Sequence, residues 1–415
     1  MPNSLPQFKL GSIVIPALLP ALAFSIGEGA VIPIIPIVAH NLGAQLAIAG
    51  LIAAMLSVGE LIGDIPSGWV VSRIGERAGM IWSALLAIIA LTVAYFSRNE
   101  WLLGVAVLLI GVSTAIFALA RHAFLTSFVP IEFRARALST LGGSFRLGLL
   151  IGPFVAAGVI HLTGTTETAF LVHIGGCLVA IGLLVFIPEP SATFNRSESS
   201  SEAAPHPERN GLLATLRRNR KVLVRLGTGA AIIGALRSSR QVVIPLWAVS
   251  IGLSDTQTAL LVGVAAALDF ALFYTTGQIM DRWGRMWTAM PSMIGLGLGH
   301  LALAASIQLP AQVTWLVACT MILALANGFG AGLLMTMGAD LADKRDPAPF
   351  LGAWRFTGDL GRASAPLAIS AITALSSLSL AVGAMGILGL IGAGILGRYI
   401  PRFVGHLKSP EQEPK

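Results

Sequence analysis

The feature that most constrains this chain is a long apolar run that recurs along nearly its whole length. A helix that crosses a bilayer needs about 20 mostly apolar residues, and the sequence offers about twelve such stretches. The backbone must form its hydrogen bonds within each segment in lipid, so we expect every span to be an α-helix. The expected spans are 12–39, 46–71, 79–97, 101–128, 137–162, 168–188, 222–251, 256–280, 287–307, 313–339, 349–375 and 377–399.

Composition supports a membrane protein and leaves little chain for a soluble domain. Of the 415 residues 55% are hydrophobic and 11% are charged, whereas soluble domains have about 25% charged residues. The 46 glycines suit helices that pack closely in lipid. The net charge of +7 is better explained by basic loops on one side of a membrane than by nucleic-acid binding.

Basic residues gather in alternate loops, whereas the opposite loops hold Arg98 alone. The basic set is Arg73, Arg77, Arg134, Arg136, the 217–221 cluster, Arg282, Arg285, Lys344, Arg345, Arg398, Arg402 and Lys408. This asymmetry predicts a multi-pass protein of the plasma or inner membrane with both termini in the cytoplasm.

A segment rich in Ser, Glu and Pro follows the sixth span and then becomes basic at Arg217 to Lys221. It cannot bury a core, so we interpret it as a cytoplasmic linker. We therefore expect an N-terminal half at 1–188, a linker at 189–221, and a C-terminal half with a short cytoplasmic tail at 222–415.

The two halves look like copies of one unit. Gly277-Gln278-Ile279-Met280-Asp281-Arg282-Trp283-Gly284-Arg285 closes one apolar run, and Gly68-Trp69-Val70-Val71-Ser72-Arg73-Ile74-Gly75-Glu76-Arg77 closes another. The offset from Gly68 to Gly277 is 209 positions, and the same offset pairs Pro36 with Pro245, Glu60 with Asp269 and Glu28 with Arg237. Further along, an offset of 213 pairs Pro153 with Pro366 and Arg146 with Asp359. Secondary transporters are often built from repeats of this kind.

The pattern G-x-x-x-D-R-x-G-R at a helix end resembles the signature loop of the major facilitator superfamily. That loop joins the second and third helices of each six-helix half in the family. The resemblance therefore implies twelve transmembrane helices in two pseudo-symmetric halves, with one central substrate site. It also implies a gating role for Gly68, Arg73, Gly75, Arg77, Gly277, Asp281, Arg282, Gly284 and Arg285.

Three other segments extend the resemblance. The stretch 130–137 is similar to the family's fourth-to-fifth helix loop, in which Arg134 and Arg136 would meet carboxylates of the gating loops. Gly148, Gly152 and Pro153 resemble a fifth-helix motif of drug and proton antiporters, although the adjacent glycines of the full motif are missing. A structural role for these glycines, in close packing and a helix bend, fits the sequence as well as the antiporter motif does. Arg121 lies in the fourth span, where proton-coupled drug exporters of the family place an arginine.

Ionisable residues inside the spans are the candidate substrate and proton-coupling groups, because burying them in lipid is costly. They comprise five acids and five arginines, namely Glu28, Glu60, Asp64, Arg121, Arg146, Arg237, Arg240, Asp269, Asp359 and Arg362. A carboxylate can take up a proton and an arginine cannot lose one, so the acids are the candidate coupling groups.

Pairings among these charges follow from the repeat and the spacing. By the resemblance, Glu28 and Arg237 would face each other across the cavity, either near the substrate or as a structural salt bridge. Asp359 and Arg362 are three residues apart on one helix and can pair, which favours a structural role. Arg146 could pair with Glu60 or Asp269, and the sequence does not choose between them.

These observations predict a secondary transporter rather than an enzyme, with a small-molecule substrate, protons and the lipid bilayer as its partners and no nucleic acid. No lysine follows a glycine run in a nucleotide-binding pattern and no histidines have metal-ligand spacing, so we expect no cofactor and a proton gradient as energy source. The leading hypothesis is proton-coupled efflux of small amphiphilic organic compounds by a monomer. The alternatives are proton-coupled uptake of a polar metabolite or organic anion, and a non-transporting receptor or scaffold.

Overall fold

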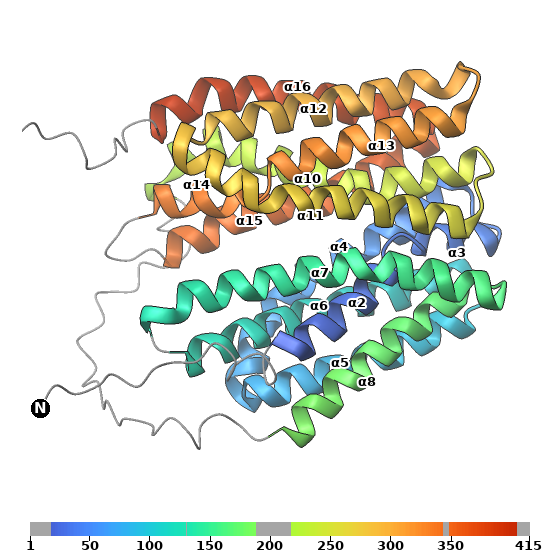
Figure 1. Ribbon diagram of the computed structural model, residues 1–415, viewed down its shortest axis with the longest axis horizontal. Helices are drawn as coiled ribbons and strands as arrows, with labels where there is room; N and C mark the ends of the chain where they lie inside the picture. The colour runs from blue at the N-terminus through green and yellow to red at the C-terminus, as the bar shows by residue number, and fades with distance from the viewer. Residues whose placement is uncertain (1–17, 130, 188–216, 343–347, 405–415) are drawn as a thin grey trace, which may run out of the picture. The chain divides into compact units, whose positions relative to one another are not determined.

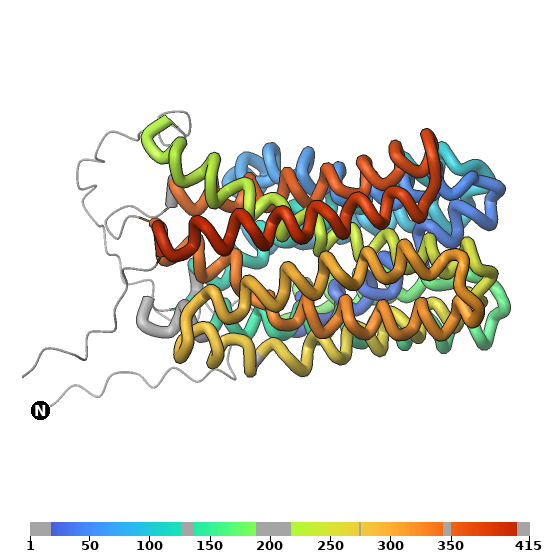
Figure 2. The backbone as a smooth tube through the Cα atoms, turned by 90° about the horizontal axis from the view of Figure 1, so that it is seen from above, coloured from blue at the N-terminus to red at the C-terminus, as the bar shows by residue number. Residues whose placement is uncertain are grey.

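Long helices account for almost all of the chain that the computed structural model describes, namely residues 18–129, 131–187, 217–342 and 348–404 (Figure 1). The chain divides into two compact units, Met1–His206 with Ser254–Gly263, and Pro207–Leu253 with Val264–Lys415. In each unit the helices run along roughly one direction (Figure 2). An all-helical membrane fold is therefore confirmed, while the predicted boundaries 1–188, 189–221 and 222–415 stay a prediction. Residues 188–216 of the predicted linker lie outside the described residues.

The first unit contains α2 Leu19–Val31, α3 Ile35–Asn41, α4 Leu46–Ile74, α5 Glu76–Phe96, α6 Glu100–Phe128, α7 Ile131–Thr163, the short η2 Thr166–Thr168 and α8 Ala169–Phe186. The second contains α10 Arg220–Ser250, most of α11 Asp255–Trp283, α12 Met286–Ala305, the short η4 Ser306–Gln308, α13 Gln312–Phe329, α14 Leu333–Leu341, α15 Ala348–Leu375 and α16 Leu378–Phe403.

Within the described residues, 11 helical segments are long and apolar enough to cross a membrane. Each coincides with an expected span to within a few residues, apart from the part of the first expected span that lies outside the described residues. The remaining expected span, 349–375, corresponds to α15, which is not in that set and carries Arg355, Asp359 and Arg362 within a short stretch.

Two expected spans are interrupted, which the apolar pattern alone does not reveal. The first is divided into α2 and α3 around Pro33, because proline lacks the N–H that continues a helix. The span expected at 313–339 is divided into α13 and α14 at Gly330-Ala331-Gly332, where Gly332 has a φ of +76°. The prediction of one continuous helix is therefore wrong in both places.

Glycines allow the helices to approach closely at the glycine-proline motif. A Cβ added at Gly148 would lie 2.5 Å from Ser25 Cβ, and one at Gly152 would lie 2.4 Å from the Ile26 carbonyl oxygen. The motif therefore packs α7 against α2, and α7 continues without interruption past Pro153. The second unit has an equivalent contact between α10 and α15, because a Cβ at Gly361 would lie 1.9 Å from the Ala231 carbonyl oxygen.

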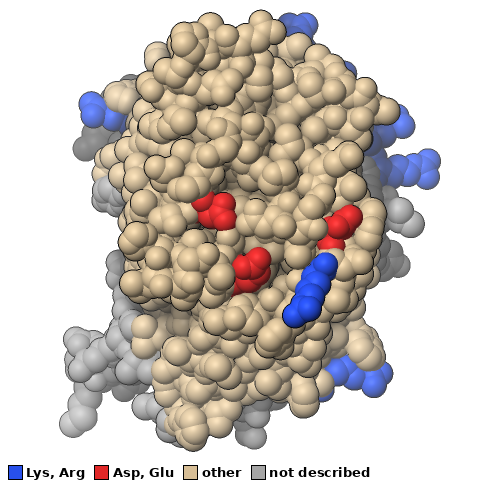
Figure 3. Space-filling view, turned by 90° about the vertical axis from the view of Figure 1, so that its right-hand side faces the viewer, with Lys and Arg blue, Asp and Glu red and all other residues tan. Residues whose placement is uncertain are grey.

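Both units expose large apolar side chains, as helices in contact with lipid should. Ile65 and Phe186 of the first unit are each 85% exposed, and Leu375 of the second is 88% exposed. Figure 3 shows a different face, on which the helices end, and there a few acidic and basic side chains stand among other residues. A soluble protein would rarely leave so much apolar surface uncovered.

Candidate functional site

In the second unit, side chains from two helices contact a buried carboxylate on a third helix. Arg240 Nη2 of α10 lies 3.2 Å from Asp269 Oδ2 of α11, and Asn327 Nδ2 of α13 donates to the same oxygen at 2.5 Å. The side chains of Arg240 and Asp269 are only 12% and 16% exposed. A carboxylate buried this deeply needs such partners, because removing one of them leaves an uncompensated charge.

The same helices hold the interruption between α13 and α14. Arg237, about one turn before Arg240 on α10, donates through Nη2 to the carbonyl oxygen of Gly330. Thr276 of α11 donates through Oγ1 to the carbonyl oxygen of Gly328 at 2.9 Å. The carbonyl oxygens of Gly328 and Gly330 also accept from the backbone N–H groups of Ala331 and Leu333, so the two side-chain bonds are additional and connect α10 and α11 to the interruption.

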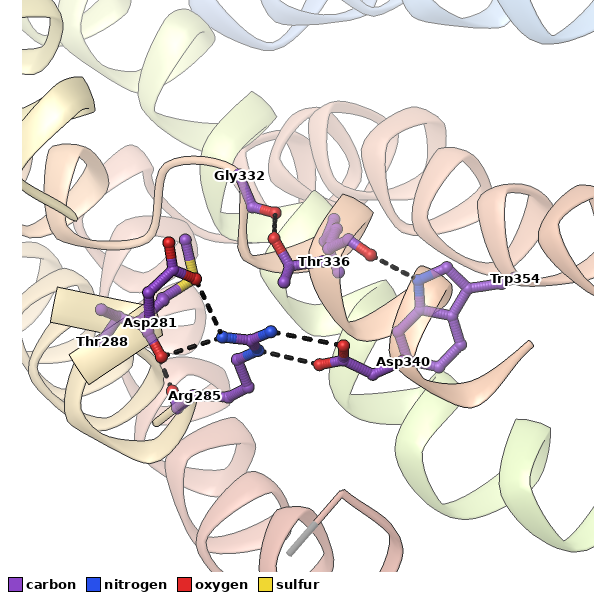
Figure 4. Close-up of polar contacts among 9 residues, drawn as sticks. Asp281, Arg285, Thr288, Gly332, Thr336, Asp340 and Trp354 are labelled. Carbon is purple, nitrogen blue, oxygen red and sulfur yellow. Dashed lines mark hydrogen bonds and ion pairs between the residues drawn. The ribbon is translucent and has the colours of Figure 1, made fainter. Parts of the chain in front are cut away.

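The second signature loop is held by a two-pronged ion pair (Figure 4). Arg285 contacts Asp340 of α14 through Nε at 2.8 Å and Nη2 at 3.3 Å, and Nη1 donates to the Met280 carbonyl oxygen at 2.8 Å. The carboxylate of Asp281 is 3.5 Å from Nη1, and its side chain is 82% exposed. The main partner of Arg285 is therefore Asp340, whose side chain is 14% exposed.

The first signature loop has the same turn and different contacts. Gly75 and Gly284 end the two loops' helices with φ of +85° and +92°, a conformation that favours glycine. Arg77 donates to the carbonyl oxygens of Leu184 and Ile187, at 2.5 and 2.7 Å, where α8 ends. Ser72, which stands in the place of Asp281, donates to the Trp69 carbonyl oxygen on its own helix at 2.9 Å.

The remaining loop positions have simpler surroundings. Arg73 lies over the Trp69 ring at 5.1 Å, and Arg282 lies over the Trp283 ring at 5.7 Å. Gly68 and Gly277 lie within α4 and α11, and a Cβ on either would meet no atom within 4 Å. The backbone at Arg134 and Arg136 belongs to α7, but their side chains lie outside the described residues.

The candidate ionisable side chains of the first unit are buried to different degrees. Glu28 on α2 is 5% exposed, and Arg121 on α6 is 9% exposed with its guanidinium 4.9 Å from the centre of the Phe145 ring. Glu60 on α4 and Arg146 on α7 are half-buried. Glu28 belongs to a different unit from Arg237, and Glu60 to a different unit from Asp269, so the roles inferred from these pairs stay predictions.

Asp359 on α15 has the predicted partner and a second one. Arg362 Nη2 lies 3.7 Å from Asp359 Oδ1, and Arg355 Nε lies 3.3 Å from Asp359 Oδ2. The two arginine side chains are 53% and 64% exposed, whereas that of Asp359 is 20% exposed. The structure thus brings three charges of one helix together, with the carboxylate shared between two arginines.

The sequence profile described as Major Facilitator Superfamily matches residues 18–366, and a second match covers 226–415. The chain belongs to the major facilitator superfamily. It is a membrane transporter of that superfamily and not an enzyme.

Proteins similar to this chain include a tetracycline resistance protein and a probable anion transporter. It is 25% identical to the class B tetracycline resistance protein of Escherichia coli over 325 residues, which are 75% of this chain and 76% of the relative. It is 26% identical to probable anion transporter 7 of rice (Oryza sativa subsp. japonica) over 162 residues, 38% of this chain. The rice match spans only about a third of that protein's length, 36%.

Solved structures show the same fold at low identity. The inward-open xylose transporter of E. coli has a TM-score of 0.70 and 17% identity, with 95% of this chain and 97% of that chain covered. A POT family transporter in complex with a peptide conjugate has a TM-score of 0.74 and 15% identity, with 95% and 96% covered. These likenesses establish the superfamily fold.

Sequence reasoning about this superfamily member missed three residues that take part in the contacts around Asp269, Arg237 and Arg285. Asn327 and Gly330 lie in an uncharged stretch, so a search for ionisable residues passes over them. The signal that could have found them is the run Asn327-Gly328-Phe329-Gly330-Ala331-Gly332, whose three glycines are unfavourable for a continuous helix. Asp340 directly follows the expected span 313–339, where a charge needs no explanation. Among the described residues no group of His, Cys, Asp and Glu could hold a metal ion.

Proposed function

We propose that this transporter exports small amphiphilic organic compounds in exchange for protons, by alternating access. One match that spans three quarters of both chains, 75% of this one and 76% of the relative, is to a tetracycline resistance protein. A membrane transporter gives resistance by lowering the amount of compound inside the cell. Export of an amphiphilic compound therefore fits this chain better than uptake.

The observation that carries the proposal is the buried carboxylate of Asp269 between Arg240 and Asn327. Protonation would remove the negative charge of the carboxylate, whereas the guanidinium keeps its positive charge. Arg240 would then lose its counter-charge and favour a different partner. A proton can in this way change the contacts between α10, α11 and α13, which is what coupling to a proton gradient requires.

Uptake of an organic anion or polar metabolite with protons is the second candidate. The rice anion transporter match favours it, as does a 26% match over 145 residues to the cis,cis-muconate transport protein of Acinetobacter baylyi, 35% of each chain. Arg237 and Arg240 on one face of α10 would suit an anion. In this structure, however, Arg240 already has Asp269 as its counter-ion.

The cellular setting belongs to the same proposal. The basic loops support a plasma or inner membrane location with both termini in the cytoplasm. We further propose that the transporter acts as a monomer, uses the proton gradient and needs no cofactor, with halves at 1–188 and 222–415 joined by a cytoplasmic linker.

Direction can be tested with inverted and right-side-out vesicles from bacteria that express the protein, with tetracycline as the probe. Export predicts energised accumulation in inverted vesicles and its loss when nigericin collapses the pH gradient. Vesicles from cells without the protein are the control. Accumulation only in right-side-out vesicles would contradict export and support uptake.

A further inference from the structure

Arg240, Asp269 and Asn327, which we call the Asp269 cluster, leave three of their own polar atoms without a hydrogen-bond partner. Among the described residues, Arg240 Nε, Asp269 Oδ1 and Asn327 Oδ1 are buried and make no hydrogen bond. A buried polar atom without a hydrogen bond costs about 1–3 kcal/mol. Three such atoms on side chains that already contact one another indicate a place where a further group is bound.

The bonds within the cluster explain why these atoms are available. Both donors, Arg240 Nη2 and Asn327 Nδ2, use the same carboxylate oxygen, Asp269 Oδ2. The second carboxylate oxygen, the amide oxygen and the Nε–H of the guanidinium therefore have no partner within the cluster. Asn327 as a whole is only 8% exposed, so bulk water does not reach its amide freely.

Charge limits what such a group can be. The opposite charges of Arg240 and Asp269 compensate each other, and Asn327 is neutral. An added carboxylate would meet the like charge of Asp269, and an added ammonium group would meet that of Arg240. An uncharged group avoids both repulsions.

Hydrogen-bond capacity narrows the choice further. The buried atoms of the cluster that lack a partner are two acceptors, Asp269 Oδ1 and Asn327 Oδ1, and one donor, Arg240 Nε. The complementary group has two donors and one acceptor. A primary carboxamide has that inventory, with two N–H donors and a carbonyl oxygen, and a pair of hydroxyl groups can supply it as well.

We propose that Arg240, Asp269 and Asn327 form the subsite for an uncharged group of the transported compound that presents two hydrogen-bond donors and one acceptor. Asn327 is then a specificity residue, because its amide orients the carboxylate through Nδ2 and accepts from the ligand through Oδ1. That the bound compound is cargo rests on the proposed export function; the binding chemistry can be tested by itself.

The test uses the full chain in lipid nanodiscs, free of glycoside detergents that carry hydroxyl groups. The probes are one aryl scaffold as its primary carboxamide, its N,N-dimethyl carboxamide and its carboxylate, titrated by calorimetry. We expect the carboxamide to bind at least about tenfold more tightly than either counterpart, since each loses hydrogen bonds or gains repulsion. Asn327→Leu should reduce this preference to near unity, while Glu100→Gln at the start of α6 should retain it.

Equal affinities, no binding of any probe, or a preference that survives Asn327→Leu would each overturn the proposal. Such results would mean that only water satisfies these atoms. Asp269→Asn should also abolish the preference for the carboxamide. If the Asp269→Asn protein does not fold, the double variant Arg240→Met with Asp269→Leu replaces the ion pair by apolar side chains, a change that proteins with buried ion pairs often tolerate. That double variant should fold and bind the three probes alike; a retained preference would likewise overturn the proposal.

The subsite and the export function fail in distinguishable ways. A carboxamide preference without proton-linked flux of the carboxamide would leave the subsite standing and contradict export. Proton-linked flux without any preference would do the reverse.

Discussion

At the scale of single residues, the ion pairs of this transporter are local solutions to the cost of charge in lipid. Arg240 and Asp269 come from two helices, and each would be expensive alone in hydrocarbon. Arg240 and Asn327 both contact the carboxylate of Asp269. Arg285 and Asp340 repeat the principle at the signature loop. Each pair also joins helices, so a change in its protonation or partners alters how those helices are held.

Glu28 is the residue of the first unit best suited to respond to a proton, since it is an acid in mid-span that is almost fully buried. Glu28→Gln keeps the shape and cannot exchange a proton. We expect gradient-driven tetracycline accumulation in vesicles to fall to the level of vesicles without the protein, while counterflow of tetracycline persists in part. Glu100→Gln makes the same chemical change outside the candidate site and should transport normally. Full gradient-driven accumulation by Glu28→Gln would remove Glu28 from the coupling mechanism.

At the scale of elements, the interruption between α13 and α14 is the most distinctive feature of the second unit. Its carbonyls are held by Arg237 and Thr276, and Asn327 just before it bonds Asp269. The interruption is therefore connected through hydrogen bonds to both α10 and α11. We infer that a change at Asp269 reaches α14, and with it Asp340 of the signature-loop ion pair.

Gly330→Ala tests how tightly this interruption is packed. The added Cβ would lie 2.4 Å from Ser292 Oγ and 2.9 Å from Arg237 Nη2, so one of them must move. We expect a loss of about 1–3 kcal/mol in stability from overpacking, seen as a lower thermal midpoint in nanodiscs. Gly352→Ala on α15 is the matched control, because its Cβ would meet nothing within 4 Å. An unchanged midpoint for Gly330→Ala would show that the interruption is loosely packed.

The sequence predicts helices much better than it predicts partners. Apolar runs and loop charges locate the spans because lipid imposes length and composition on every one of them. The choice of Asp340 for Arg285, or of Asn327 for Asp269, depends on how distant segments pack, and no local pattern encodes it. The interruption after Phe329 was missed because glycine is common in membrane helices. The side chains that hold it, Arg237 and Thr276, come from other helices, and no local pattern indicates them.

At the scale of the whole molecule, the proposed export function rests on one physical claim. It requires that buried carboxylates such as Glu28 and Asp269 are kept in a membrane because their protonation is linked to the movement of cargo. A receptor or scaffold of the same fold would gain nothing from ten ionisable residues inside its spans. Proton movement that depends on cargo is therefore the property that separates these accounts.

The most direct measurement is the internal pH of liposomes that contain only this protein and a trapped pH-sensitive dye, recorded as tetracycline is added outside. Exchange predicts that entering tetracycline drives protons out, so the interior becomes more alkaline in wild-type liposomes, with no such change for Glu28→Gln. A more acidic interior would indicate uptake together with protons. The same signal in wild-type liposomes, Glu28→Gln liposomes and liposomes without protein would contradict the account.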